Sequence, residues 1–120
     1  MKILLATQKP FAAAAVNGIR SILEEAGNEV VLLEKYAGED ELVAAVADVD
    51  AMIIRSDKVT ARVLDAAPKL KIVVRAGAGF DNVDLAAATA HGVVVENTPG
   101  QNSNAVAELA IAMMIYMSRN

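Results

Sequence analysis

Short apolar runs alternate with helix-like segments along the whole chain. Each run is rich in Val, Ile and Leu and is bounded by polar or turn residues, which is typical of strands buried in a parallel sheet. The runs lie at residues 2–6, 29–33, 51–54, 72–74 and 93–95. After each run, apolar residues recur at helical spacing, which predicts a helix. The predicted helices lie at residues 10–26, 38–48, 61–67, 83–90 and 104–118.

This alternation predicts a single α/β domain that occupies residues 1–120. Five strands that each lead into a helix predict a doubly wound five-stranded parallel sheet with right-handed crossovers. The common strand order for such a sheet is 2-1-3-4-5, with helices on both faces. The composition agrees, because 55% hydrophobic residues with only 3% aromatic residues predict an aliphatic core.

Turn and capping residues mark the ends of the predicted helices. Pro10 suits the first turn of the first helix, and Gly27 is a stop signal at its end. Thr60 is expected to cap the third helix, and Asp81 or Asn82 the fourth.

Charge and cysteine content exclude several classes of function. Eleven basic and fifteen acidic residues give a net charge of −4, and the basic residues are scattered, so we expect no nucleic-acid partner. The chain has no cysteine, which excludes disulfides and thiolate metal sites and fits the cytoplasm. The first apolar run is too short for a signal peptide, and the last apolar helix is too short to span a bilayer, so we expect no membrane partner.

A glycine-rich loop follows the fourth predicted strand. Arg75 is succeeded by Ala76, Gly77, Ala78 and Gly79. Glycine permits a left-handed backbone and close approach, so successive N–H groups can turn toward a carboxylate or phosphate beside the arginine. A tight strand-to-helix turn without a ligand explains the glycines equally well.

A second cation follows the third strand, where Arg55 precedes Ser56. Ligands of open α/β sheets bind beyond the carboxyl ends of the strands, so the loops at residues 7–10, 55–58, 75–82 and 96–104 should meet there. Two arginines beside a glycine-rich loop suit a small anion that carries hydroxyl groups. Either arginine alone could instead be a surface charge or a structural ion pair.

Two other features suggest chemistry that their context does not support. The run Gly77-Ala78-Gly79 begins like a dinucleotide fingerprint, with Glu96 at the end of the next strand, but Asn82 replaces the third glycine. The only histidine, His91, joins a helix to the start of the fifth strand, so a role at the helix carboxyl end is expected rather than catalysis.

The acids that follow the third and fourth strands are expected to cap helices rather than to bind a metal ion, because no histidine accompanies them. These acids are Asp57, Asp81 and Asp84.

Three motifs, taken in order, resemble the amino-terminal part of the D-isomer-specific 2-hydroxyacid dehydrogenases. They are Ile54-Arg55-Ser56, the run from Val74 to Asp84, and Asn97-Thr98-Pro99 followed by Asn104 to Leu109. The resemblance covers essentially the whole chain. It implies a flavodoxin-like substrate-binding domain that faces a separate NAD-binding Rossmann domain across a cleft.

The resemblance also implies roles for individual residues. Arg55, Ser56 and Arg75 would hold the acidic groups of a 2-hydroxy acid substrate, and the backbone of residues 76–79 would hold its carboxylate. The segment from Asn97 to Asn104 would line the hinge and the cleft.

The resemblance places the cofactor and the catalytic groups outside this chain. In the family, the NAD fingerprint and the catalytic residues belong to a domain that follows the position of Asn120. We therefore expect no catalytic, cofactor-binding or metal-binding residue here, and no dehydrogenase activity from this chain alone, with NAD bound in the full-length protein. The alternative is a stand-alone module that binds a small anion, or senses it for regulation, without catalysis.

The last predicted helix is apolar on every face between residues 109 and 117. A helix that covers one side of a sheet needs only an apolar stripe, so an all-round apolar helix implies further burial. The missing NAD-binding domain is one partner that the resemblance implies. Without it we expect a homodimer through the 104–118 helix.

Overall fold

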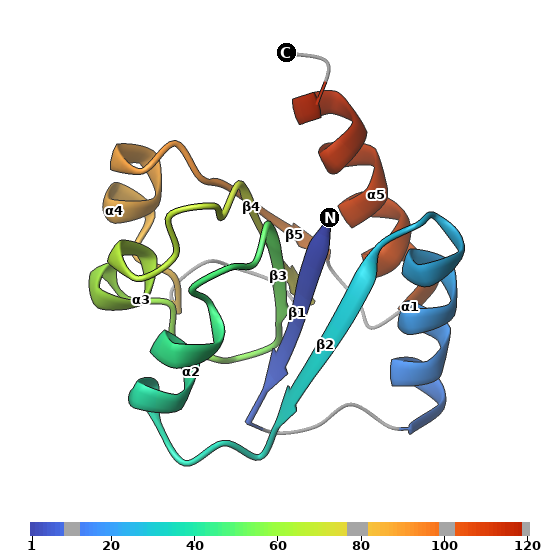
Figure 1. The fold of residues 1–120 in the computed structure, drawn as a ribbon, viewed down its shortest axis with the longest axis horizontal. Coiled ribbons are helices and arrows are strands. Elements are labelled where there is room, and N and C mark those ends of the chain that lie inside the picture. The colour runs from blue at the N-terminus through green and yellow to red at the C-terminus, as the bar shows by residue number, and fades with distance from the viewer. Residues whose placement is uncertain (9–12, 77–81, 99–102, 119–120) are drawn as a thin grey trace.

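The computed structural model of the protein describes residues 1–8, 13–76, 82–98 and 103–118, without the side chains of residues 103, 104, 113, 114 and 116–118. Strands and helices alternate through these residues (Figure 1). The strands are β1 (Lys2–Thr7), β2 (Glu29–Glu34), β3 (Ala51–Ile54), β4 (Ile72–Ala76) and β5 (Val94–Thr98). The helices are α1 (Ala13–Glu25), α2 (Glu39–Ala45), α3 (Ala61–Asp65), α4 (Leu85–Ala90) and α5 (Ser103–Ser118).

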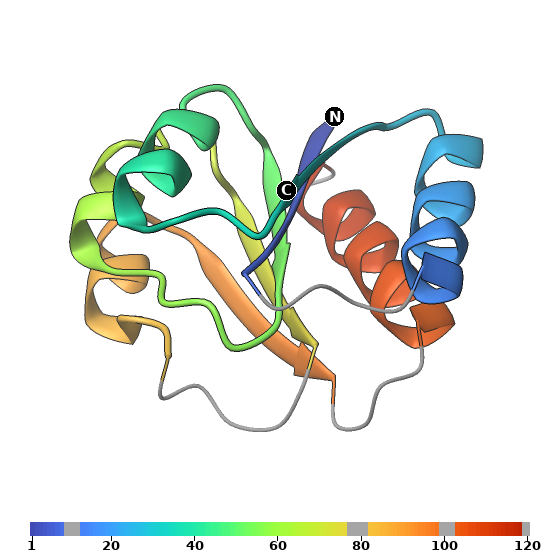
Figure 2. The same cartoon turned by 90° about the horizontal axis from the view of Figure 1, so that it is seen from below.

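The strands form one parallel sheet in the order β2-β1-β3-β4-β5, which confirms the predicted order. Helices α1 and α5 cover one face, and α2, α3 and α4 cover the other (Figure 2). Every strand therefore points the same way, and the loops that follow the strands gather at one edge of the sheet.

Two hydrophobic clusters fill the described core, one on each face of the sheet. In β1, Leu4 packs toward α2, α3 and α4, whereas Ile3 and Leu5 pack toward α1 and α5. Successive side chains of a strand point to opposite faces, so a strand covered on both faces must be apolar at every position. This explains the uninterrupted apolar runs of the sequence.

Glycine follows the carboxyl ends of two helices, and the sequence predicts this role for Gly27. After α1, Gly27 has φ +89°, and the N–H of Asn28 donates to the carbonyl of Leu23 at 3.1 Å. After α4, Gly92 has φ +72°, and the N–H of Val93 donates to Ala88 at 2.8 Å. In both places a residue without a β-carbon takes the left-handed conformation that satisfies the last helical carbonyls.

The predicted helix bounds were partly wrong. Helices α2 and α3 end at Ala45 and Asp65, two or three residues early, although the apolar residues beyond them, such as Val46, remain buried. Thr60 caps α3 as predicted, because its hydroxyl accepts from the N–H of Val63 at 3.4 Å. The apolar residues beyond Ala45 and Asp65 are therefore buried without the two helices continuing through them.

The prediction that Asp81 or Asn82 caps α4 was wrong for Asn82, whereas the expectation that Asp84 caps a helix is confirmed. The helix begins at Leu85, and the carboxylate of Asp84 accepts from the N–H of Ala87 at 3.0 Å. Asn82 makes other contacts, described below, and Asp81 lies outside the described residues.

The two strands nearest the predicted site are longer than expected. Arg75 was predicted to open a loop, but β4 continues to Ala76, and β5 continues to Thr98. Arg75 pairs in register with Asn97 of β5. Polar residues continue these strands because each has a neighbouring strand that supplies the ladder hydrogen bonds.

Candidate functional site

The two predicted arginines meet at the carboxyl edge of the sheet. Arg75 lies in β4 and Arg55 directly follows β3, and both are half-buried. The Nε of Arg75 donates to the backbone carbonyl of Arg55 at 3.1 Å. The structure thus brings the side chain of Arg75 to the backbone of Arg55, 20 residues away in the sequence.

The structure describes some of the other predicted site residues, and the rest lie outside its described part. Ser56 is exposed next to Arg55, and Asn97 is half-buried beside Arg75 in the sheet. Ala76 is the buried last residue of β4. The described residues do not include Gly77, Ala78 and Gly79. The binding of an anion by their backbone N–H groups therefore stays a prediction. Asn104 lies in the first turn of α5, and its side chain is likewise outside the described part.

Asp57 holds the loops of this edge together, although its place in the sequence predicts a helix cap. Only 3% of the residue is exposed. Its Oδ1 accepts from the N–H of Arg55 at 3.1 Å, and its Oδ2 accepts from the N–H of Gln8 at 2.8 Å. The hydroxyl of Tyr36 also donates to Oδ2. One carboxylate therefore joins the loops that follow β1, β2 and β3.

Asn82 adds the loop that follows β4 to this arrangement. Its Nδ2 donates to the carbonyl of Asp57 at 2.7 Å and to that of Arg55 at 3.3 Å. Next to it, Val59 and Val83 form a bridge between the two loops. Asn82 is thus a link between loops rather than a helix cap.

Several buried polar atoms at this edge have no hydrogen-bond partner among the described residues. They are the hydroxyls of Thr7 and Thr98 and the Oδ1 of Asn82. Thr7 ends β1 and Thr98 ends β5, so both lie where ligands of such sheets bind. Buried polar atoms usually have a hydrogen-bond partner, so these three atoms are exceptions among the described residues.

A cavity of about 290 Å³ lies beside the loops, on the side of α2 and α3. Its lining residues are Gln8, Tyr36, Glu39, Leu42, Ser56, Lys58 and Thr60.

Lys35, just before Tyr36, has a left-handed φ of +53°, and its N–H donates to the carbonyl of Thr7 at 3.1 Å. This turn at the end of β2 brings the Tyr36 side chain back to Asp57.

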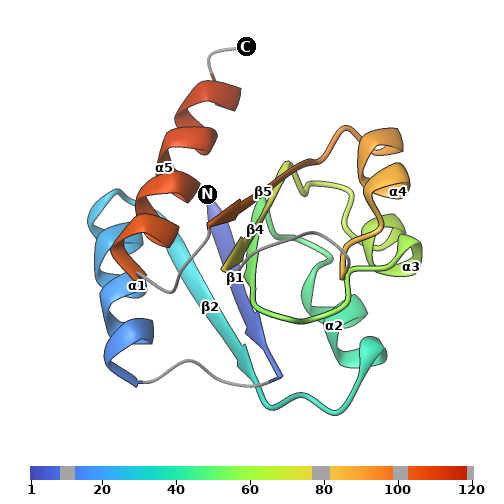
Figure 3. The ribbon, with the colours of Figure 1, turned by 180° about the vertical axis from the view of Figure 1, so that it is seen from behind.

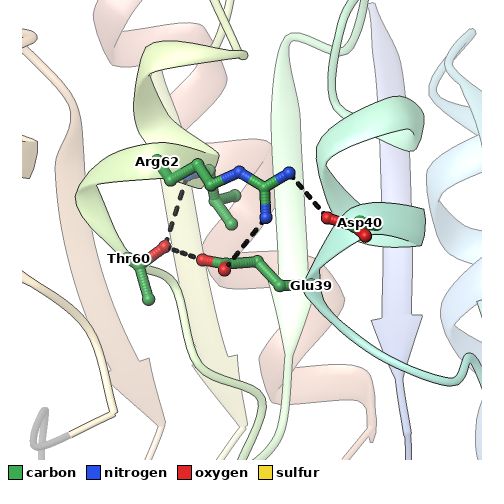
Figure 4. A network of polar contacts seen from close by, with 5 residues as sticks. Glu39, Asp40, Thr60 and Arg62 are labelled. Carbon is green, nitrogen blue, oxygen red and sulfur yellow. Dashed lines mark hydrogen bonds and ion pairs between the residues drawn. The ribbon is translucent and has the colours of Figure 1, made fainter.

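A polar network joins α2 to the start of α3 (Figure 4), and two of its members, Glu39 and Thr60, line the cavity. The Thr60 hydroxyl donates to Glu39. Arg62 bonds Glu39 at 3.2 Å and Asp40 at 2.6 Å. The hydrogen bond from Thr60 and then the contact with Arg62 lower the pKa of Glu39. Glu39 is therefore already engaged within the protein.

Burial, followed by the hydrogen bond to Asp57, raises the pKa of the Tyr36 phenol above its ordinary value. Only 7% of Tyr36 is exposed. Tyr36 therefore stays a neutral hydrogen-bond donor to Asp57 across the physiological pH range.

The remaining sequence candidates lie away from this edge or are otherwise engaged. His91 caps the carboxyl end of α4, as expected, and its Nε2 lies 2.7 Å from Asp65. The dinucleotide interpretation needs a pyrophosphate at the start of the helix that follows the glycine loop. Asp84 places a carboxylate there, which disfavours a second anion by like-charge repulsion. Among the described residues no three acids or histidines are grouped to hold a metal ion.

Sequence reasoning missed Asp57, Tyr36 and Gln8 as site residues. The loop after β2 was left out of the predicted carboxyl edge. The feature of the sequence that could have indicated this loop is Tyr36, which is one of two tyrosines in the chain and directly follows a predicted strand. The hydroxyl of a buried tyrosine usually needs a partner, which points to an acceptor such as Asp57.

Comparison with known proteins identifies the family. The family model described as D-isomer specific 2-hydroxyacid dehydrogenase, catalytic domain, matches residues 11–118. The chain belongs to this dehydrogenase family. The resemblance of the three motifs is thereby confirmed.

Similar proteins within the family share a name. The chain is 48% identical over 101 residues to D-3-phosphoglycerate dehydrogenase of Homo sapiens, which covers 83% of this chain and 19% of that protein. It is 56% identical over 81 residues to the protein of the same name from Mycobacterium tuberculosis, covering 67% of the chain and 15% of that protein. The chain therefore spans about a fifth of the length of these relatives.

Solved structures confirm the fold. The NAD+-bound 3-phosphoglycerate dehydrogenase of Entamoeba histolytica matches with a TM-score of 0.83 and 53% identity, over 97% of this chain and 38% of that one. The D-lactate dehydrogenase of Escherichia coli matches with a TM-score of 0.68 and 26% identity, over 96% and 36% of the two chains.

No helix in the described part of the chain is long and apolar enough to cross a membrane.

Proposed function

We propose that this chain is the substrate-binding domain of an NAD-dependent D-2-hydroxyacid dehydrogenase that acts on D-3-phosphoglycerate. The observation that carries the proposal is the convergence of Arg55 and Arg75 at the carboxyl edge of the sheet, where the Nε of one meets the carbonyl of the other. The identity to proteins named D-3-phosphoglycerate dehydrogenase supports this choice of substrate.

In this proposal the chain positions the substrate. A 2-hydroxy or 2-oxo acid with a distal phosphate carries anionic groups at both ends. Guanidinium groups bind carboxylate and phosphate through paired N–H donors, which are the contacts proposed for Arg55 and Arg75. Ser56 and Asn97 flank the two arginines and would bind the hydroxyl or carboxylate oxygens. The backbone of residues 76–79 and Asn104 would complete the site.

NAD would be held by a Rossmann domain outside this chain, where it exchanges a hydride with C2 of the substrate. The carboxylate of Asp84 at the start of α4 supports the proposal that residues 1–120 do not hold the cofactor. We further propose that the full-length protein is a cytoplasmic enzyme of serine biosynthesis and that this chain forms a homodimer. We therefore expect no turnover of NADH and phosphohydroxypyruvate by this chain alone.

Titration of the chain with D-3-phosphoglycerate, followed by the NMR shifts of backbone amides, tests the proposal. We expect the largest shifts at residues 55–56 and 75–79, and weaker binding of D-lactate, which lacks the phosphate. Equal affinities for the two acids would contradict the choice of substrate. Shifts that centre on α1 instead would contradict the site itself.

A further inference from the structure

We propose that Asp57 is a positioning residue of this site. Its buried carboxylate, without touching the substrate, would hold the Arg55–Ser56 segment in the conformation that binds the substrate's anionic groups. This inference rests on the proposed function, because it explains how the chain keeps its substrate-binding cation in place.

The peptide groups on both sides of Arg55 are fixed. Its N–H donates to Asp57 at 3.1 Å. Its carbonyl accepts from Arg75 at 3.1 Å and from Asn82 at 3.3 Å. The backbone of Arg55 therefore cannot turn without breaking contacts to β4 and to Asp57. A fixed backbone lowers the conformational entropy that is lost when the side chain binds an anion.

Asp57 itself is held from two other loops. The N–H of Gln8 donates to its Oδ2 at 2.8 Å, and the hydroxyl of Tyr36 donates to the same oxygen. These contacts span 49 and 21 residues of sequence. The position of Arg55 is thereby set relative to β1 and β2 as well as to β4.

The chemistry of the contacts requires a carboxylate. Three donors meet its two oxygens, and an ionised carboxylate is an acceptor only. In Asp57→Asn the amide nitrogen would replace one oxygen and present N–H groups to Gln8 or to Arg55. One backbone N–H would then lose its acceptor, although the size of the side chain is almost unchanged.

Two measurements on the same variants test this role. D-3-phosphoglycerate binding is measured by NMR titration, and hydrogen exchange is followed at the amides of Arg55 and Gln8. We expect Asp57→Asn to raise the dissociation constant about 10-fold or more, the effect of losing a hydrogen bond within a charged network. We also expect faster exchange at one of the two amides, with exchange in the centre of β3 unchanged.

Asp84→Ala is the matched control. Asp84 is also an aspartate that accepts a backbone N–H, at 3.0 Å, but it caps α4. Its loss should lower the urea midpoint of unfolding, because α4 loses its cap, while leaving the dissociation constant unchanged. An equal loss of affinity in the two variants would mean that any destabilisation weakens binding, and it would overturn the role of Asp57.

Tyr36→Phe decides the question if Asp57→Asn fails to fold, because it removes one donor and leaves both backbone contacts of the carboxylate. We expect a rise of about 3-fold in the dissociation constant, a fraction of the effect of a whole hydrogen bond, with faster exchange at Arg55. Wild-type affinity in the folded Asp57 variant, or in Tyr36→Phe where only that variant folds, overturns the positioning role alone. A wild-type chain that does not bind the acid overturns the proposed function together with it.

Discussion

Tyr36 is a phenol whose hydroxyl is held by a carboxylate in the interior of the protein. Burial and Asp57 raise the pKa of Tyr36, so the folded chain keeps the phenolic proton at a pH where the unfolded chain releases it. The stabilisation is complete below the unfolded pKa of about 10 and is lost as the pH rises through the folded pKa.

We predict that Tyr36→Phe removes part of the alkaline loss of stability. Above pH ~10, the wild-type free energy of unfolding should fall more steeply, by up to about 1.4 kcal/mol per pH unit for one proton. Urea unfolding of both proteins from neutral to alkaline pH measures the difference. Parallel curves would show that the phenol titrates equally in the folded and unfolded chains.

The two arginines of the site give a second prediction at this scale. Arg75→Ala should weaken D-3-phosphoglycerate binding by roughly 1.5–3 kcal/mol, the range for a hydrogen bond to a charged group. Arg75→Lys should restore only part of the loss, because lysine keeps the charge but lacks the planar fork of donors. Isothermal titration of the three proteins measures the effect.

Arg20→Ala is the control for charge. Arg20 lies in the middle of α1 and bonds Glu24 of the same helix at 3.1 Å. Its removal changes the net charge as Arg75→Ala does, so equal effects of the two substitutions would mean that only diffuse charge attracts the ligand.

At the scale of elements, the carboxyl end of α4 shows how one backbone conformation ends a helix. Gly92 has φ +72°, and no atom outside the neighbouring residues lies within 4 Å of where its β-carbon would be. A substitution there is therefore disfavoured by the backbone and not by a clash with the surroundings.

We predict that Gly92→Ala lowers the free energy of unfolding by about 1 kcal/mol, the cost of a left-handed conformation for a residue with a β-carbon. Gly92→Asn should cost less, because asparagine tolerates this conformation better. Thermal and urea unfolding of the variants measure the loss. Equal losses for alanine and asparagine would contradict the backbone explanation.

At the scale of the whole molecule, helix α5 is only partly covered by the rest of the described chain. Val106, Ala107 and Ala110 are buried against the sheet and α1. Toward its carboxyl end the helix runs past the amino ends of the strands (Figures 1 and 3), and Ile115 is 48% exposed. An apolar helix with such an end favours burial against another protein surface.

We predict that the chain self-associates through α5 at tens of micromolar, a range in which dimers of modest affinity form. Ile115→Lys should shift the population toward monomer in analytical ultracentrifugation, because it places a charge in the proposed contact. Leu85→Lys is the matched control, since Leu85 is 46% exposed on α4 across the sheet. A wild-type monomer, or equal effects of the two substitutions, would contradict the prediction.

The sequence alone determined the layout of this protein. Uninterrupted apolar runs such as residues 51–54 marked the strands, because a strand covered on both faces must be apolar throughout. Their alternation with helices predicted a parallel sheet, for which the common strand order is the one that the structure confirms. The same layout placed Arg55 and Arg75 at one edge, because parallel strands end together.

The tertiary structure decided what those residues contact. Arg75 and Asn97 became strand residues because each found a neighbour in the sheet, which local sequence does not encode. Asp57 lies in the loop that leads to α3, yet its contacts with Gln8 and Tyr36 lie 49 and 21 residues away. Such contacts form only when the loops of separate strands meet. The sequence therefore located the site, whereas the packing of the loops decided which buried carboxylate holds it together.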